Sequence, residues 1–167
     1  GGEFSLVNAW FESVSGFTTT GSTILNDIEV LPRGLQFWRM SSTWIGGMGV
    51  VMFALLILPS LGRNKMTLSS VELSTLAKDN YRYRTQIIVQ LLLVVYVGLT
   101  VLTTVLLKMA GMNWFDSLCH AMSACATSGF STKNASVAYF NSPMIDTILL
   151  FAMATAGIHF GLIYATV

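Results

Sequence analysis

The fold is decided by Asn113–Thr132, NWFDSLCHAMSACATSGFST. This stretch lies between two long apolar runs, Gln86–Leu107 and Met144–Val167, and is itself too short to cross a bilayer. It opens with Asn113 and Asp116, whose side chains can accept hydrogen bonds from the free backbone N–H groups of a helix start. About ten small or apolar residues follow, enough for roughly 15 Å of helix at about 1.5 Å per residue.

The helix-forming pattern stops at Thr127–Thr132, TSGFST, which is polar and contains a glycine. Irregular backbone at membrane depth is tolerated only where it lines water or is buried in protein. The stretch therefore predicts a pore loop, in which a half-depth helix returns through an irregular segment.

Composition indicates an integral membrane protein. Of the 167 residues, 53% are hydrophobic and only 10% are charged, whereas soluble domains carry about 25% charged residues. A net charge of +1 without a basic cluster gives no indication of nucleic-acid binding. The sequence shows no GxSxG or HExxH motif and no paired intramembrane aspartates, so we do not predict an enzyme.

Two cysteines, Cys119 and Cys125, lie inside the predicted half-helix, where they point to different faces. We therefore expect two free thiols, with neither a disulfide nor a metal site. Gly1–Phe4 lacks the basic start and apolar core of a signal peptide. The chain has no initiator methionine and begins almost at a motif, so we expect an internal piece of a longer polypeptide.

The same pattern occurs near the start of the chain. Ser5–Phe17 is a short run with helix-cap candidates at Ser5 and Asn8, and Thr18–Thr23, TTTGST, follows it. Three consecutive threonines disfavour a helix because they are β-branched. Gly21 allows backbone angles that other residues avoid.

Two registers relate the two copies. One aligns the identical tripeptides Ser15–Phe17 and Ser128–Phe130; the other aligns Gly21 with Gly129. We prefer the second register, because it gives both half-helices the same length from cap to filter and explains the threonine run.

Three runs are long enough to span a membrane core, for which about 20 apolar residues suffice. They are Leu35–Leu58, Gln86–Leu107, which Lys108 caps, and Met144–Val167. Pro59 closes the first of these runs.

Several features of the first span carry expectations. Arg39 is expected to snorkel to the membrane interface, and Trp38 and Trp44 are expected in an interfacial aromatic belt. The glycines of Gly46–Gly49 indicate either a hinge or close helix packing, and we favour the packing.

The connection Gly62–Arg84 is polar and basic, with Glu72 and Asp79 as its acidic residues. By the positive-inside rule it lies in the cytoplasm, and both filter-like segments then lie in the external half. Its basic residues are Arg63, Lys65, Lys78, Arg82 and Arg84.

The resulting fold class is an all-α membrane protein built from repeated units of span, pore helix, filter and span. Residues 1–60 form the end of a first unit, residues 61–85 the cytoplasmic connection, and residues 86–167 a second unit. Such units surround a pore with pseudo-fourfold symmetry, as in potassium channels.

The two filter segments suit a dehydrated monovalent cation, because backbone carbonyls replace its water shell without binding it irreversibly. The carboxyl end of each half-helix adds about half an elementary negative charge. No carboxylate lies within either filter, so a divalent-cation site is not predicted. The predicted ligands, through their carbonyl oxygens, are Thr19, Thr20, Gly21, Ser22, Thr127, Ser128, Gly129 and Phe130.

These motifs resemble the TrkH/KtrB/HKT superfamily of potassium transporters, and in particular its bacterial TrkH branch. The resemblance rests on TTTGST at 18–23, on WIGGMG at 44–49 with ILP following, and on WFDS and TSGFST within 114–132. It implies potassium uptake through filter carbonyls around Gly21 and Gly129, with potassium as the substrate and no bound cofactor. In the plant relatives, glycine rather than serine at the first filter is associated with selectivity for potassium over sodium.

The resemblance also implies partners and a location. Members form homodimers in the bacterial inner membrane and bind a cytoplasmic nucleotide-binding ring of the TrkA type. Four units surround the pore in one chain, so a third and a fourth unit, with the gating loop, are expected outside this sequence.

An alternative function remains open. A secondary transporter with re-entrant hairpins could bind another small solute at its half-helix ends. His159 within the third span is either a proton or ligand site or a bundle hydrogen-bonding group. His120 and Glu12, on the two half-helices, are expected to support the filters or pack rather than act as ligands.

Overall fold

The computed structural model of the protein describes residues 5–62 and 75–165, with side chains described for 5–49, 90 and 92–157. These residues are helical with connecting loops, and no strand is found among them. The elements in chain order are α1 (Leu6–Phe17), α2 (Arg33–Gly62), α3 (Thr75–Met109), α4 (Trp114–Cys125), the 3-10 helix η2 (Ser136–Phe140) and α5 (Pro143–Ala165).

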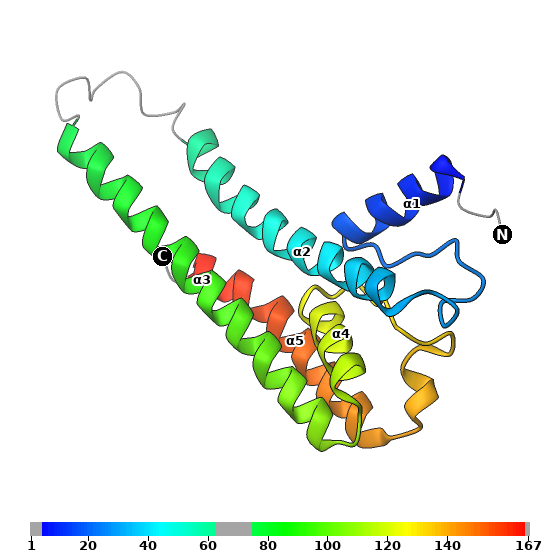
Figure 1. Ribbon diagram of the computed structural model, residues 1–167. Helices are drawn as coiled ribbons and strands as arrows, with labels where there is room; N and C mark the ends of the chain where they lie inside the picture. The colour runs from blue at the N-terminus through cyan, green and yellow to red at the C-terminus, as the bar shows by residue number, and fades with distance from the viewer. Residues whose placement is uncertain (1–4, 63–74, 166–167) are drawn as a thin grey trace.

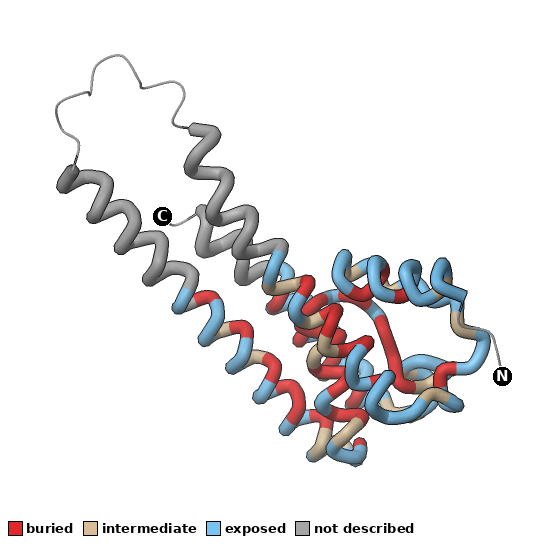
Figure 2. The backbone as a smooth tube through the Cα atoms, turned by 45° about the horizontal axis from the view of Figure 1, so that its top comes forward, coloured by how far each residue is buried: buried red, intermediate tan, exposed pale blue. Residues whose placement is uncertain are grey.

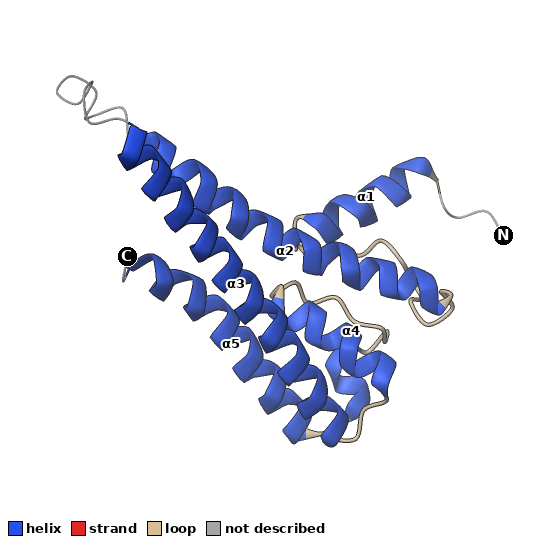
Figure 3. Ribbon diagram, turned by 60° about the vertical axis from the view of Figure 1, so that its left-hand side comes forward, coloured by secondary structure: helices blue, strands red, loops and turns tan. Residues whose placement is uncertain are grey.

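Among the described residues, three long α-helices, two short α-helices and the 3-10 helix η2 make up the fold (Figure 1). The long helices α2 and α3 form an antiparallel pair, and α5 lies beside α3 (Figure 3). The short helix α4 packs against α2, α3 and α5, whereas α1 packs against α2. The expectation of a helical protein is confirmed for the described residues.

One helix in the described part of the chain is long and apolar enough to cross a membrane, over Leu92–Met109 of α3. Pro143–Gly157 of α5 is a shorter apolar stretch. Side chains of the first predicted span are described only up to Gly49, and His159 lies outside the residues whose side chains are described.

The long helices extend further than the sequence predicts. Helix α2 continues through Pro59 to Gly62, so Pro59 closes the apolar run of the sequence without ending the helix. Proline removes one helical hydrogen bond, a loss that helices in membrane proteins tolerate. Helix α3 begins at Thr75, so the last part of the predicted polar connection is helical, in keeping with the helix propensity of lysine and arginine. Residues 63–74 lie outside the described residues.

Both short helices begin with a side-chain cap. The Ser5 hydroxyl accepts from the Val7 N–H at 3.3 Å, and Asn113 Oδ1 accepts from the Asp116 N–H at 2.8 Å. Asn8 lies inside α1 rather than at its cap. The caps predicted at Ser5 and Asn113 are confirmed, and each satisfies an N–H group that the helix leaves free.

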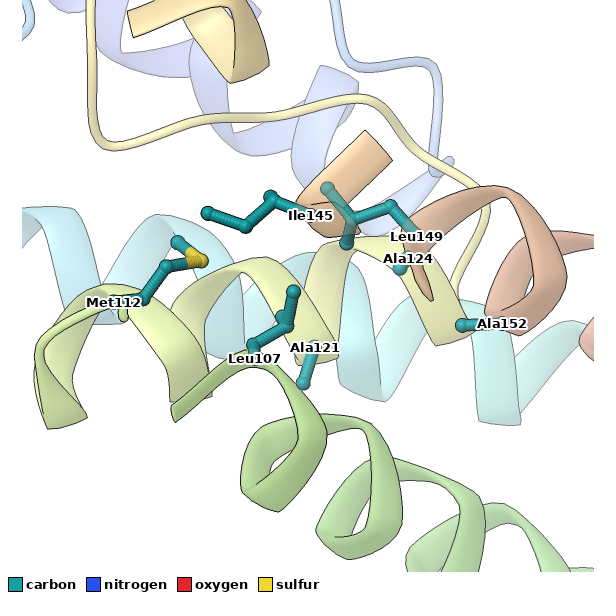
Figure 4. Close-up of a cluster of buried hydrophobic side chains, with 7 residues drawn as sticks. All are labelled: Leu107, Met112, Ala121, Ala124, Ile145, Leu149 and Ala152. Carbon is teal, nitrogen blue, oxygen red and sulfur yellow. The ribbon is translucent and has the colours of Figure 1, made fainter. Parts of the chain in front are cut away.

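A core joins α3, α4 and α5 at the end of the molecule where the short helices lie (Figure 2). Alanines on α4 let the neighbouring helices approach closely, and larger side chains of α3 and α5 fill the space between them (Figure 4). The buried members are Leu107, Met112, Ala121, Ala124, Ile145, Leu149 and Ala152. Cys119 and Cys125 are buried free thiols, as predicted.

Two expectations for the first span are wrong. Arg39 is buried and pairs with Glu12 at 3.0 Å, so its charge is balanced inside the protein and does not reach the interface. Trp44 faces the helix bundle, where its Nε1–H donates to the Thr100 hydroxyl at 3.0 Å and its ring contacts Tyr96. A polar tip allows an aromatic side chain to pack inside when a partner is within reach.

Candidate functional site

The segments that follow α1 and α4 have the same backbone conformation. Thr19 and Thr127 have φ of 55° and 52°, and Gly21 and Gly129 have φ of 73° and 83°. Positive φ is rare for a β-branched residue and marks local strain, which is kept only where the surrounding structure holds it. The strain occurs at the same place after both short helices.

The hydrogen bonds at the two helix ends also match. The N–H groups of Thr18, Thr19 and Thr20 bond to the carbonyls of Val14, Gly16 and Ser15 at 2.9, 2.9 and 3.0 Å. In the second copy, the N–H groups of Ala126, Thr127 and Ser128 bond to the carbonyls of Met122, Ala124 and Ser123 at 3.1, 3.0 and 3.0 Å. This correspondence places Gly21 opposite Gly129, whereas Gly16 lies inside α1 at the position of Ala124.

The two segments touch each other. A Cβ placed on Gly21 would overlap the carbonyl group of Ser128, whereas a Cβ on Gly129 meets no described atom within 4 Å. The structure therefore brings the predicted ligands Thr19–Ser22 and Thr127–Phe130 together at Gly21. The close approach requires a residue without a side chain there.

The first segment is held by polar side chains of α1. Glu12 is buried, and its Oε1 accepts from the Thr23 hydroxyl at 2.6 Å and from the Ile24 N–H at 2.7 Å. The Ser15 hydroxyl donates to the Ser22 carbonyl at 2.6 Å. These bonds fix the chain directly after Gly21.

Equivalent side chains of α4 hold the second segment. His120 is buried, and its Nε2 lies 2.9 Å from the Ser131 hydroxyl. The Thr132 hydroxyl donates to Asp116 Oδ1 at 2.7 Å, and the Ser123 and Ser128 hydroxyls are 3.1 Å apart. The bonds of His120 and Glu12 show that each side chain supports the segment that follows its own helix.

Two glycines of α2 lie against the carboxyl ends of the short helices. A Cβ on Gly46 would overlap the Phe17 backbone, and one on Gly47 would lie 3.1 Å from the Ala126 Cβ. No described atom lies within 4 Å of a Cβ on Gly49. Close packing therefore explains both glycines: a side chain at Gly46 would push the end of α1 away, and one at Gly47 would be tightly crowded by the end of α4.

The loop before α2 is joined to the loop after the second segment. Asn134 Oδ1 accepts from the Ile28 N–H at 2.7 Å, and its Nδ2 donates to Asp27 Oδ1 at 2.8 Å. Lys133 lies 3.5 Å from a Glu29 carboxylate oxygen. The Asn134 amide favours the charged carboxylate and lowers the pKa of Asp27 below its usual value.

Sequence reasoning missed the roles of Asn134 and Arg39. Asn134 was one polar residue among several in a loop, and Arg39 stood at a span end where snorkelling is common. Glu12, the one charged residue of the first half-helix, was the signal that an arginine would be paired inside.

A polar cavity of about 220 Å³ lies beside this loop contact. Its walls come from α2, α4 and the two joined loops, and include Glu29, Arg33, Gln36, Asn113, Asp116 and Lys133. No group of three or more His, Cys, Asp and Glu side chains that would hold a metal occurs in the described part of the chain.

Short helices that end at strained, glycine-containing turns, packed beside long helices of which one is apolar enough to cross a membrane, are consistent with a helical membrane protein. The profile of the TrkH family, described as a cation transport protein, matches residues 2–167. The chain belongs to this family, whose members are transporters and not enzymes.

Relatives and a solved structure agree with this assignment. The chain is 42% identical over 159 residues to the Trk system potassium uptake protein TrkH of Salmonella typhimurium, covering 95% of this chain and 33% of that protein. It is 42% identical over 144 residues to the Trk system potassium uptake protein TrkI of Halomonas elongata, covering 86% of this chain and 29% of that protein. The crystal structure of the potassium transporter TrkH from Vibrio parahaemolyticus superposes with a TM-score of 0.73 at 36% identity, over 89% of this chain and 29% of the other. The chain thus spans about a third of the length of these relatives.

Proposed function

We propose that the chain supplies two potassium-coordinating segments of a larger Trk-type uptake protein. The ligands are the backbone carbonyls of Thr19–Ser22 and Thr127–Phe130, and potassium is the transported ion. The relatives named above are potassium uptake proteins, which supports potassium over other cations.

One observation carries the proposal: the two segments share the same strained backbone and meet at Gly21. We infer that two segments that approach this closely, each held by its own half-helix, would present carbonyls toward one shared axis. The half-helices end at these segments, so their carboxyl ends contribute negative potential where the cation would bind.

The pore needs more than this chain. Two filter segments leave part of a cation's coordination shell open, and Gly129 has space for a further segment beside it. We propose pseudo-fourfold repeats, residues 1–60 and 86–167 being parts of the first two units. Residues 1–167 alone are then expected not to conduct.

Partners and topology follow from the same proposal. The connection 62–84 lies in the cytoplasm of a bacterium, at the inner membrane, where a nucleotide-binding ring would dock. The complete protein is proposed to be a homodimer.

Flux of radioactive rubidium into vesicles tests the function. Vesicles holding the full-length protein should take up rubidium, and excess potassium should block this uptake far better than excess sodium. Protein-free vesicles and vesicles with residues 1–167 alone are the controls. Absence of rubidium uptake by the full-length protein would favour a transporter of another solute.

Single cysteines test the topology, in a background where Cys119 and Cys125 are replaced. A cysteine at Asp79 should be labelled only from the cytoplasm. A cysteine at Asn26, an exposed position, should be labelled only from outside. The reverse pattern would refute the proposed orientation.

A further inference from the structure

A buried arginine lies between the two segments. Arg39 of α2 has only 7% of its surface exposed. Its Nε donates to Glu12 Oε2 at 3.0 Å, and its guanidinium carbon lies 4.3 Å from the centroid of the Phe130 ring. One cation therefore contacts a carboxylate that supports the first segment and the last residue of the second filter.

The carboxylate side of this contact is shared. Glu12 uses Oε2 for Arg39 and Oε1 for Thr23 and Ile24, directly after the first filter. A movement of Arg39 would turn the carboxylate and weaken both bonds to the segment. The matching position of α4 is occupied by His120, which bonds to Ser131.

The aromatic side of the contact is equally buried. Phe130 has 3% of its surface exposed and packs with Met40 and Cys119. Arg39 Nη1 and Nη2 find no hydrogen-bond acceptor among the described residues, so the face of the Phe130 ring is the contact that offsets their burial. Cation–π contacts are strongest when both groups are removed from water.

We propose that Arg39 is a positioning residue that couples the ends of the two filter segments, so that the ion preference of each depends on the other. The inference rests on the proposed function, since it assigns the segments to a filter. Arg39 does not contact the ion and acts through Glu12 and Phe130. The planar guanidinium of Arg39 contacts the Phe130 ring and at the same time donates to the Glu12 carboxylate. Lysine cannot replace it, because an ammonium group has no planar face.

Hydrogen exchange of the full-length protein tests the coupling without ion flux. Arg39→Lys keeps the charge that balances Glu12, and is expected to accelerate exchange in both segments, 18–24 and 127–132. Phe130→Leu should also accelerate exchange in 18–24, and should add nothing there when Arg39 is already lysine. Arg33→Gln, a change at an exposed arginine of the same helix, is the matched control and should leave both segments unchanged.

Uptake measurements complete the test. The ratio of rubidium to sodium uptake, per amount of protein in the membrane, should fall about tenfold in Arg39→Lys, the change produced by about 1.4 kcal/mol. The coupling would be overturned if Arg39→Lys lowered rubidium and sodium uptake equally and so kept their ratio. It would also be overturned if hydrogen exchange accelerated in only one of the two segments. Exchange rates in the double variant that equal the product of the two single effects would overturn it as well. If the wild-type protein prefers rubidium and Arg39→Lys keeps that preference, the coupling alone fails. If the wild-type protein shows no preference, the proposed function fails with it.

Discussion

A Cβ on Gly21 would overlap the backbone carbonyl of Ser128. Two separate constraints therefore require glycine at position 21. Its φ of 73° is unfavourable for other residues, and the second segment lies too close for a side chain. Gly129 is required only by its φ of 83°, because a Cβ there meets no described atom within 4 Å. The two glycines occupy matching positions and differ in what surrounds them.

Alanine variants should separate these two requirements. In residues 1–167 alone, where no further segment lies beside Gly129, Gly129→Ala adds only the cost of positive φ, about 1–2 kcal/mol. Gly21→Ala adds the same cost and also pushes the segments apart, so it should lower the thermal unfolding midpoint more. Measurement of both midpoints in detergent decides the matter, and equal effects would show that the contact with Ser128 relaxes at no cost.

Serine variants test which glycine belongs to the filter. Gly21→Ser and Gly129→Ser should both reduce the preference for rubidium over sodium, because each adds atoms beside the proposed ion path. Gly16 lies inside α1 beside the Ser42 side chain. Gly16→Ser should cost on the order of 1 kcal/mol of stability and keep the ion preference. Growth in limiting potassium, followed by rubidium and sodium uptake, compares the three variants. Loss of selectivity in Gly16→Ser alone would favour the register that aligns the SGF tripeptides.

Two glycines of α2 offer a matched pair for packing. Gly46→Ala should lower the thermal midpoint, because the new methyl group overlaps the Phe17 backbone and overpacking costs about 1–3 kcal/mol. Gly49→Ala should leave the midpoint unchanged or raise it, since alanine is about 1 kcal/mol better than glycine in a helix. Equal midpoints for the two variants would contradict the close approach of α2 to α1.

Much of this fold was predictable from local patterns. Caps at Ser5 and Asn113, the half-length of α1 and α4, and the turns at Gly21 and Gly129 each depend on neighbouring residues, which a sequence shows directly. The internal repeat strengthened the prediction of the first turn, because the threonine run before Gly21 could be compared with the segment before Gly129.

Contacts between distant residues were not predictable. Arg39 and Trp44 have side chains with an apolar body and a polar tip, which suit a membrane interface and a protein interior equally well. Only the partners Glu12 and Thr100 decide between these environments, and neither is close in sequence. The continuation of α2 through Pro59 was also not predictable from local sequence. Proline lowers helix stability locally, but packing decides whether the helix continues.

Asp116 provides a test of the support under the second segment. Its two oxygens accept from the Thr132 hydroxyl at 2.7 Å and from Asn113 Nδ2 at 2.6 Å. Asp116→Asn replaces one acceptor by a donor, so one of the two donors, the Thr132 hydroxyl or the Asn113 amide, loses its acceptor at a cost of about 1–3 kcal/mol. The thermal midpoint should fall accordingly. Asp146→Asn, at an exposed position in the first turn of α5, should change it little. Similar midpoints for the two variants would show that Asp116 does not support the segment.

The contact between Asp27 and Asn134 predicts a pH dependence outside the spanning helices. The Asn134 amide lowers the pKa of Asp27 from its ordinary value of 3.8, because it bonds to the charged carboxylate. A lowered folded-state pKa means that the contact stabilises the joined loops at pH values above 3.8, and that this stabilisation is lost as the pH falls through the folded-state pKa.

Asn134→Ala should raise the pKa of Asp27 back toward 3.8, as measured by NMR titration of aspartate-labelled full-length protein. Asn26→Ala, at an exposed position of the same loop, is the matched control and should leave the titration unchanged. Because Asn134 also accepts from the Ile28 N–H, its loss should separate the two loops at every pH, whereas acid should weaken only the Asp27–Asn134 contact of the wild-type protein, below the folded-state pKa of Asp27. A titration of Asp27 that is the same with and without Asn134 would show that the amide does not hold this carboxylate in solution.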